Sequence, residues 1–279
     1  MEKLVFIVNP ISGGKDKRKV LKTLGKGIDG SRFDWSVRMT EYAGHGREIA
    51  RDCDADIVVA VGGDGTVSEV AQGVAGTKKH LGISRCPRKA IRQLNRSERT
   101  IMDYGTVEGR PFFCTTGVGM DAQVAWEFAK AGSRGLKTYV SKTLSVWRTF
   151  RPGHYRLEID GAVHELDATF ITVANVNQWG NNAVIAPEAT VTDGLFDITV
   201  LRPFRIWDIP GLALRLFTRT FTRSGKVDTF RGKKIVLHRE SAAPAHFDGD
   251  PIEMGTDIHI DIHPAAVRVL VPEGRSYKI

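Results

Sequence analysis

One short segment has the residue types that bind phosphate, Gly62-Gly63-Asp64-Gly65-Thr66, and it directly follows the apolar run 56–61. Glycines without a Cβ atom let a bulky anion approach the backbone. A helix that begins here would add free N–H groups and the positive end of a dipole. Asp64 could then position a magnesium-bound polyphosphate or a substrate hydroxyl. The alternative is a tight strand-to-helix turn with a capping aspartate; the place at a strand end favours the functional interpretation.

A second glycine turn, Asn9-Pro10-Ile11-Ser12-Gly13-Gly14-Lys15, ends the first apolar run of the chain. Its spacing matches neither a Walker A sequence nor GxGxxG. Alone it indicates little, but together the two turns predict neighbouring anion-binding loops at adjacent strand ends.

Asp248-Gly249-Asp250 is a third candidate, because it offers two carboxylates around a glycine. From the residues alone, a hairpin turn with solvated acids is the favoured interpretation over a catalytic one.

The elements that must position these residues fall into two groups. Residues 1–104 alternate between expected strands (4–8, 35–40, 56–61) and helical segments (15–24, from 46 and after 65), which predicts a doubly wound, Rossmann-like α/β domain. In residues 105–279, a strand at 111–116 and two helices precede a mainly β pattern. An Asp160-Gly161 hairpin and strands at 170–176, 195–201, 234–238, 258–262 and 267–271 predict an antiparallel β-sandwich domain.

The composition of the chain limits the kinds of binding partner that it suits but does not single out one of them. The formal net charge of +8 suits nucleic acid, an anionic membrane or a phosphorylated small molecule. The three cysteines, Cys53, Cys86 and Cys114, are scattered and typical of reduced residues in a cytoplasmic protein. No secretory leader or membrane-spanning run is expected, so membrane contact would be peripheral. Residues 202–226 mix aromatic and arginine side chains, typical of a membrane-surface element or a solvated helix. No nucleic-acid-binding module accompanies the charge.

The two glycine turns are similar to motifs of the diacylglycerol-kinase catalytic family, which includes bacterial lipid kinases and sphingosine kinases. Further resemblances follow in the family's order. Thr40 with Gly44-His45-Gly46 resembles a Thr…Gly-His-Ala segment, and Gly117–Ala122 resembles the glycine turn that opens the second domain. Segment 185–197 resembles the C-terminal-domain signature, and Asp248-Gly249-Asp250 stands where the family has Asp-Gly-Glu. The resemblance implies the two-domain fold of NAD kinases and diacylglycerol kinases.

It also implies roles for individual residues. ATP would be held by Asn9, Ser12, Gly13, Thr40 and residues Gly62 to Thr66. Asp64 would organise the catalytic Mg²⁺, and Asp250, in the motif with Asp248, would take the proton from the lipid hydroxyl. Asp193, with the carbonyls of Thr190 and Leu195, would hold a second, structural Mg²⁺.

The sequence departs from the family at two places. Asp250 is one methylene shorter than the usual glutamate. After Ile83 the family has a Pro-x-Gly-Thr-x-Asn-Asp loop, whereas this chain continues through Ser84-Arg85-Cys86 to Pro87, a residue typical of a helix start. The fold is expected to survive this shortening, but ATP affinity and phosphate transfer are expected to suffer.

The leading hypothesis is therefore an ATP- and magnesium-dependent lipid kinase acting on diacylglycerol or a related lipid at the inner membrane face. Its partners would be ATP and a lipid, and a homodimer is left open. The alternatives are an NAD kinase-like enzyme and a non-catalytic nucleotide- or membrane-binding protein on the same fold.

Overall fold

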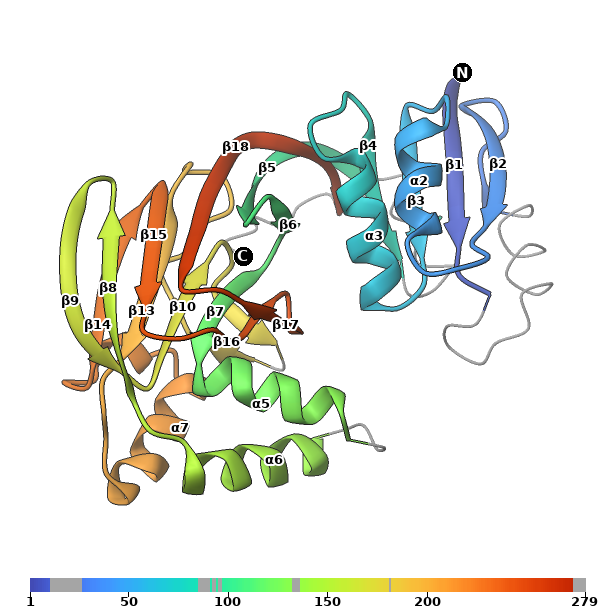
Figure 1. Ribbon diagram of the computed structural model, residues 1–279. Coiled ribbons are helices and arrows are strands. Elements are labelled where there is room, and N and C mark those ends of the chain that lie inside the picture. The colour runs from blue at the N-terminus through green and yellow to red at the C-terminus, as the bar shows by residue number, and fades with distance from the viewer. Residues whose placement is uncertain are drawn as a thin grey trace. The chain divides into compact units, whose positions relative to one another are not determined.

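The computed structural model describes residues 1–10, 27–84, 91, 94, 97–131, 136–180 and 182–272. Within this part the chain forms two compact units, residues 1–102 with 265–272 and residues 103–264 (Figure 1). The predicted helix at 15–24 and the predicted ATP contacts Ser12 and Gly13 lie outside the described residues.

Unit 1 is built on a parallel sheet with the strand order β2-β1-β3-β4-β18. Its elements are β1 (Glu2–Val8), β2 (Phe33–Met39), α2 (His45–Asp52), β3 (Ile57–Val61), α3 (Asp64–Val74), β4 (His80–Ser84) and the last part of β18 (Asp257–Pro272). The chain moves from β1 outward to β2 and then returns to pair β3 on the other side of β1. This reversal is the topological switch point of a doubly wound fold, so the predicted fold class of the first domain is confirmed.

The central strands are buried on both faces, as their continuous apolar runs predict. All five residues of β3 are buried. One face of the sheet carries Phe6 and Val59 in a cluster with Ile91 and Leu94. Helices α2 and α3 pack so closely that a Cβ atom at Gly73 of α3 would lie only 2.4 Å from the carbonyl oxygen of Arg47 in α2. Glycine at this position therefore permits the close packing.

Strand β18 joins the end of the chain to both units. Its first part pairs antiparallel with β15 in unit 2, and Arg268 and Val269 pair parallel with β4 in unit 1. Ala265 has a φ of 50° where the strand passes from one unit to the other. The prediction of two separate strands here therefore differs from the structure. Pairing over such a sequence distance leaves no local signal.

Unit 2 is a sandwich of antiparallel strands. One sheet has the order β14-β13-β10-β7-β16-β17, and the other contains β18, β15, β8 and β9, with β5 and β6 attached through β18. The strands are β5 (Ser97–Val107), β6 (Arg110–Phe112), β7 (Thr115–Gly119), β8 (Gly153–Ile159), β9 (Ala162–Ala168), β10 (Phe170–Ala174), β11 (Gln178–Gly180), β12 (Ala183–Val184), β13 (Phe196–Leu201), β14 (Val227–Gly232), β15 (Lys234–Arg239), β16 (Ala243–Phe247) and β17 (Asp250–Met254).

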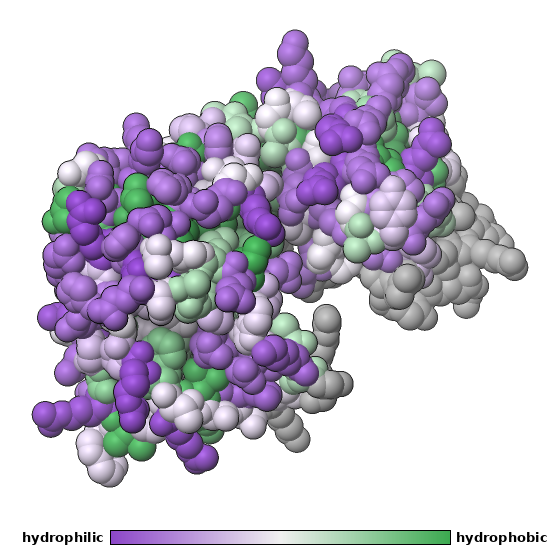
Figure 2. Space-filling view, in the orientation of Figure 1, coloured by the Kyte–Doolittle hydropathy of each residue, from purple (hydrophilic) through white to green (hydrophobic). Residues whose placement is uncertain are grey.

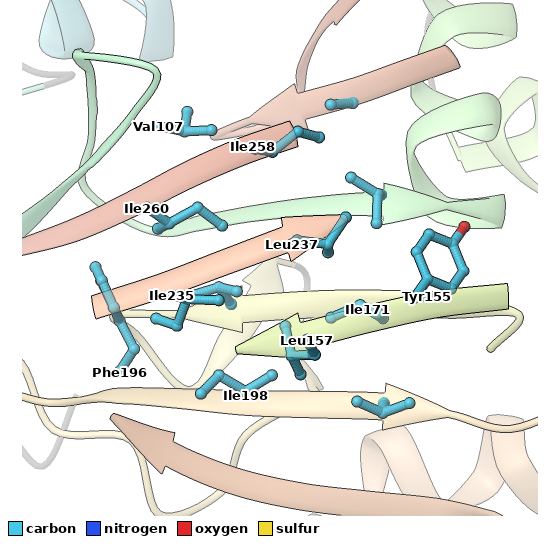
Figure 3. Close-up of a cluster of buried hydrophobic side chains, with 14 of the residues drawn as sticks. Val107, Tyr155, Leu157, Ile171, Phe196, Ile198, Ile235, Leu237, Ile258 and Ile260 are labelled. Atoms are coloured by element: carbon cyan, nitrogen blue, oxygen red, sulfur yellow. The ribbon is translucent and has the colours of Figure 1, made fainter. Parts of the chain in front are cut away.

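The core of the sandwich lies between the two sheets (Figure 3). Ile171, Phe196 and Ile198 come from the first sheet, and Leu157 and Ile235 come from the second. Alternate residues of each strand point into this core, which is the packing of a β-sandwich. The predicted fold class of the second domain is therefore confirmed.

The predicted hairpin at Asp160-Gly161 joins β8 to β9, and both turn residues have positive φ angles of 49° and 89°. The single strand predicted at 111–116 is instead two strands, β6 and β7. The chain breaks between them because the N–H groups of Phe113 and Cys114 donate to the carboxylate of Asp248.

Two helices follow β7, as predicted: α5 (Met120–Ala129) and α6 (Leu136–Thr149). Between β13 and β14 the chain forms η1 (Ile206–Asp208), α7 (Ile209–Phe217) and η2 (Phe221–Arg223). Among the described residues, no helix is both long and apolar enough to cross a bilayer.

Candidate functional site

Three loops with predicted ATP contacts begin side by side at the carboxyl edge of the parallel sheet. Val8 pairs with Met39 on one side and Val61 on the other, so the next residues, Asn9, Thr40 and Gly62, start neighbouring loops. The N–H of Asn9 donates to Val61 O (3.2 Å), and that of Thr40 donates to Val8 O (3.0 Å). The sheet therefore gathers these residues at its switch point, where open α/β sheets bind ligands.

The glycine turn between β3 and α3 is tightly constrained at its first residue. A Cβ atom at Gly62 would lie 2.4 Å from the hydroxyl oxygen of Thr66, so any larger side chain would displace the first helical turn. By contrast, a Cβ atom at Gly63 or Gly65 would meet no heavy atom of the described chain within 4 Å. The turn thus has one face packed on Thr66 and one face open to a ligand.

Helix α3 presents its N-terminus at this open face. Its first hydrogen bond between a backbone N–H and the carbonyl four residues earlier runs from Val67 to Gly63 (3.1 Å). No side chain caps the helix at Gly63. N–H groups of a first helical turn lack helical acceptors and suit an anion. The exposed Asp64 is the first helical residue, so a carboxylate lies beside the anion-binding position.

Sequence reasoning missed Glu69 of α3, which binds the backbone at the start of α2. Its carboxylate accepts N–H groups from Gly44 (2.8 Å) and Gly46 (3.1 Å). It thereby caps the N-terminus of α2 and ties that helix to α3. The Gly44-His45-Gly46 segment thus has a structural role, and helical spacing alone gave no sign of it.

In unit 2, Asp248 and Asp250 stand on either side of the β16–β17 turn but have different surroundings. Asp248 accepts N–H groups from Phe113 (2.8 Å), Cys114 (2.6 Å) and Thr115 (3.1 Å). Burial raises the pKa of Asp248, although these three donors oppose the rise. Asp250 is exposed at the start of β17. Asp248 is therefore not a solvated acid, whereas Asp250 is exposed to solvent.

A buried polar network supports the strand that leads into this turn. His246 Nε2 lies 3.1 Å from Asp121 Oδ2, and both side chains are more than nine-tenths buried. Asp121 Oδ2 also accepts from the Thr172 hydroxyl (3.1 Å), and Oδ1 accepts from the N–H of Ala122 (2.7 Å). Gly117 is required here, since a Cβ atom would lie 2.7 Å from Asp121 Oδ2. The Gly117–Ala122 motif therefore locks α5 to β16.

Asp193 lies in a turn that is held from β5. The N–H of Gly194 donates to the buried Asp103 (2.7 Å), and the N–H of Leu195 donates to Asp193 Oδ1 (3.1 Å). The other carboxylate oxygen of Asp193 forms an ion pair with Arg231. Sequence reasoning singled out Asp193 but missed Asp103 and Arg231, whose contacts are distant in sequence.

Arg231 also reaches Asp197, its direct partner across β13 and β14, with Nε 3.3 Å from Oδ1. Burial raises the pKa of Asp197 to about 6, and Arg231 acts in the opposite direction. Asp197 Oδ2 is buried and has no hydrogen-bond partner within the described chain.

The oxygen groups around Asp193 are of the kind that Mg²⁺ prefers, but the cation that contacts Asp193 in this structure is a guanidinium. A metal ion would share or compete for the Asp193 carboxylate with Arg231. The structural Mg²⁺ site at Thr190, Asp193 and Leu195 therefore stays a prediction. Among the described residues, no group of three or more histidine, cysteine or acidic residues could hold a metal ion.

A parallel domain with a phosphate-suited turn at its switch point, followed by a β-sandwich, is the two-domain fold of NAD kinases and diacylglycerol kinases. Comparison with known proteins narrows this assignment. Residues 3–88 match the diacylglycerol kinase catalytic domain, and residues 114–271 match the YegS C-terminal NAD kinase beta sandwich-like domain. The chain belongs to this family of diacylglycerol kinases and YegS-like lipid kinases.

Similar curated proteins include a diacylglycerol kinase of Bacillus subtilis, 23% identical over 93% of this chain and 96% of that protein. A probable lipid kinase YegS-like of Pseudomonas aeruginosa is 26% identical, covering 86% of this chain and 85% of that protein.

Solved structures agree on the fold. A diacylglycerol kinase from Bacillus anthracis has a TM-score of 0.74 at 18% identity, covering 98% of this chain and 97% of that one. An NAD kinase from Archaeoglobus fulgidus, solved in complex with ATP, has a TM-score of 0.53 at 15% identity, covering 97% and 94%.

Proposed function

We propose that this protein transfers the γ-phosphate of ATP to the hydroxyl group of a lipid, diacylglycerol or a close relative. The observation that carries the proposal is the glycine turn at the switch point of a chain that belongs to a lipid kinase family. Gly63 and Gly65 leave the turn open to phosphate oxygens, and the first turn of α3 offers N–H donors. Asn9 and Thr40 begin the neighbouring loops.

Phosphate transfer requires positioning and charge neutralisation more than covalent chemistry from the protein. The exposed carboxylate of Asp64, beside the open glycines, fits a magnesium ion that would neutralise charge on the phosphates. Asp250 is the proposed base: it accepts the proton of the lipid hydroxyl while that oxygen bonds to phosphorus and the bond to the ADP oxygen breaks. Asp248 positions Asp250 by fixing the turn on Phe113, Cys114 and Thr115.

The experiment measures transfer of labelled phosphate from ATP to lipids in mixed micelles with a panel of diacylglycerol, sphingosine and phosphatidylglycerol. We expect one labelled lipid product, and at least a hundredfold lower rate in both Asp64→Asn and Asp250→Asn. Asp261→Asn, which changes another aspartate that is only partly exposed in unit 2, is the control and should keep the parent rate.

No labelled lipid from the whole panel would contradict the proposal. Formation of NADP from NAD and ATP without a lipid product would assign the site to an NAD kinase instead. ATP binding without any transfer would support a non-catalytic nucleotide-binding protein.

A further inference from the structure

The helix α7 has apolar side chains on two opposite faces, although only one of them packs on the protein. Leu212 is buried and Leu216 is partly buried in a cluster with Phe170, Ile185 and Phe221. This inner face anchors the helix to unit 2. The only charged residue between Ile209 and Phe217 is Arg215. A helix that is apolar nearly all round requires a second apolar environment.

The outer face consists of exposed residues at the helical spacing i, i+3, i+4 and i+7: Pro210, Ala213, Leu214 and Phe217. Leu214 and Phe217 are 65% and 61% exposed, and in the preceding η1 Ile206 and Trp207 are 50% and 86% exposed. Figure 2 shows hydrophobic surface among hydrophilic side chains over this part of unit 2. Isolated exposed apolar residues are ordinary, but four large ones within twelve residues form a patch.

The segment that carries this patch has an excess of cationic side chains. Six lysine and arginine residues and one acidic residue, Asp208, lie between 202 and 226, and Arg202 is paired with Asp228 (3.1 Å). The carboxylate of Asp208 accepts the N–H of Arg205 (2.8 Å) and lies 3.9 Å from the ammonium of Lys226, so it is already engaged. Arg219 and Arg223 are exposed beyond the end of α7. The outer face therefore combines apolar side chains with a positive border.

We infer that the outer face of η1 and α7, with Arg219 and Arg223, docks the protein on an anionic lipid bilayer. Tryptophan and phenylalanine enter the boundary between headgroups and acyl chains. Arginines beside them contact lipid phosphates while their aliphatic stems stay near the apolar surface. This inference rests on the proposed lipid kinase function, since a lipid substrate lies in a bilayer, and it adds the surface by which the protein reaches it.

The experiment is co-sedimentation of the full chain with vesicles of phosphatidylcholine alone and of phosphatidylcholine containing phosphatidylglycerol, without ATP. We expect binding to the anionic vesicles and at least tenfold weaker binding of the double variant Trp207→Ser with Phe217→Ser. Arg219→Glu with Arg223→Glu should lose binding and its dependence on salt. The matched control changes two exposed apolar residues elsewhere, Ile101→Ser with Val163→Ser, and should bind like the parent.

Because these side chains are exposed, all variants should melt at the temperature of the parent, which separates lost docking from lost folding. Equal binding of the parent and the Trp207/Phe217 variant would overturn the inference. So would a concentration-dependent dimer that this variant abolishes without any vesicle binding, because the face would then join two copies. If the protein phosphorylates micellar lipid but its vesicle binding is the same in the parent and the variants, only the docking face is overturned. If the parent binds vesicles more tightly than the variants but phosphorylates no lipid, the docking face is supported and the proposed function is contradicted.

Discussion

Asp197 should make the folded protein less stable as the pH rises, and Asp197→Asn should remove that effect. Only 13% of its side chain is exposed, and burial raises its pKa from the ordinary 3.8 to about 6. The difference between these two pKa values corresponds to at most about 3 kcal/mol. Above both pKa values the native protein must hold a charged, partly desolvated carboxylate, which costs free energy.

The sign follows from proton binding. Between about pH 4 and about pH 6 the native protein keeps the proton of Asp197 while the unfolded chain has lost it. The unfolding free energy contributed by this residue therefore falls as the pH rises through this range. Asparagine stays neutral at every pH, and its amide oxygen can still accept from Arg231. The stability of the variant relative to the parent should thus rise by up to about 3 kcal/mol between about pH 4 and about pH 7.

Thermal melting followed by tryptophan fluorescence suits this measurement, because four of the five tryptophans, Trp126, Trp147, Trp179 and Trp207, lie in unit 2. For a unit of this size, the full effect corresponds to a relative Tm change of roughly 6–12 °C. The control is Asp228→Asn on the adjacent strand, an aspartate that pairs with Arg202 and is 38% exposed. A Tm difference between Asp197→Asn and the parent that does not change with pH would refute the reasoning.

Four further outcomes are expected. Gly62→Ala should weaken ATP binding in calorimetric titration by at least tenfold, since its Cβ would lie 2.4 Å from Thr66 Oγ1. Gly65→Ala should change folding little, because its Cβ meets no described atom within 4 Å. Asp248→Asn should lower stability by about 1–3 kcal/mol in urea unfolding, since an amide nitrogen would replace an acceptor for Phe113 or Cys114; an unchanged midpoint would contradict this. Magnesium should raise the Tm of Arg231→Leu but hardly that of the parent, because Arg231 is the cation at Asp193. An equal rise of the Tm in both proteins would instead favour a structural Mg²⁺ at Asp193 in the parent. Inserting a Gly-Thr-x-Asn-Asp loop after Ile83 should raise lipid phosphorylation, and a folded insertion variant with the parent's rate would show that the loop is dispensable.

Much of the fold could be predicted because its signals are local. Strand β3 is a continuous apolar run, and burial on both faces is what such a run requires. The Asp160-Gly161 dipeptide accepts the two positive φ angles of its hairpin turn. The Gly62–Thr66 turn carries both its signals, the glycines and the following helix, within a few residues.

The contacts that fix the remaining site depend on pairing between distant segments. Arg231 reaches Asp193 and Asp197 only because β14 pairs with β13 in one register. Glu69 is one of several polar residues on α3, and nothing near it in sequence indicates that it caps α2. Strand β18 pairs with β15 and with β4, which are separated by most of the chain. Local periodicity contains no information on any of these partners.

The Asp248-Gly249-Asp250 turn illustrates this limit most clearly. The two aspartates are chemically identical and equally close to the glycine, so only the resemblance to the family's Asp-Gly-Glu motif gives them different roles in the sequence. The difference arises at the start of β7, where Phe113, Cys114 and Thr115 donate their N–H groups to Asp248 across more than a hundred residues of chain. A carboxylate that accepts from three backbone N–H donors is poorly suited to accept a substrate proton, whereas the exposed Asp250 can do so. Exchange of the two roles would require the hairpin to shift its register by two residues and leave those donors unpaired.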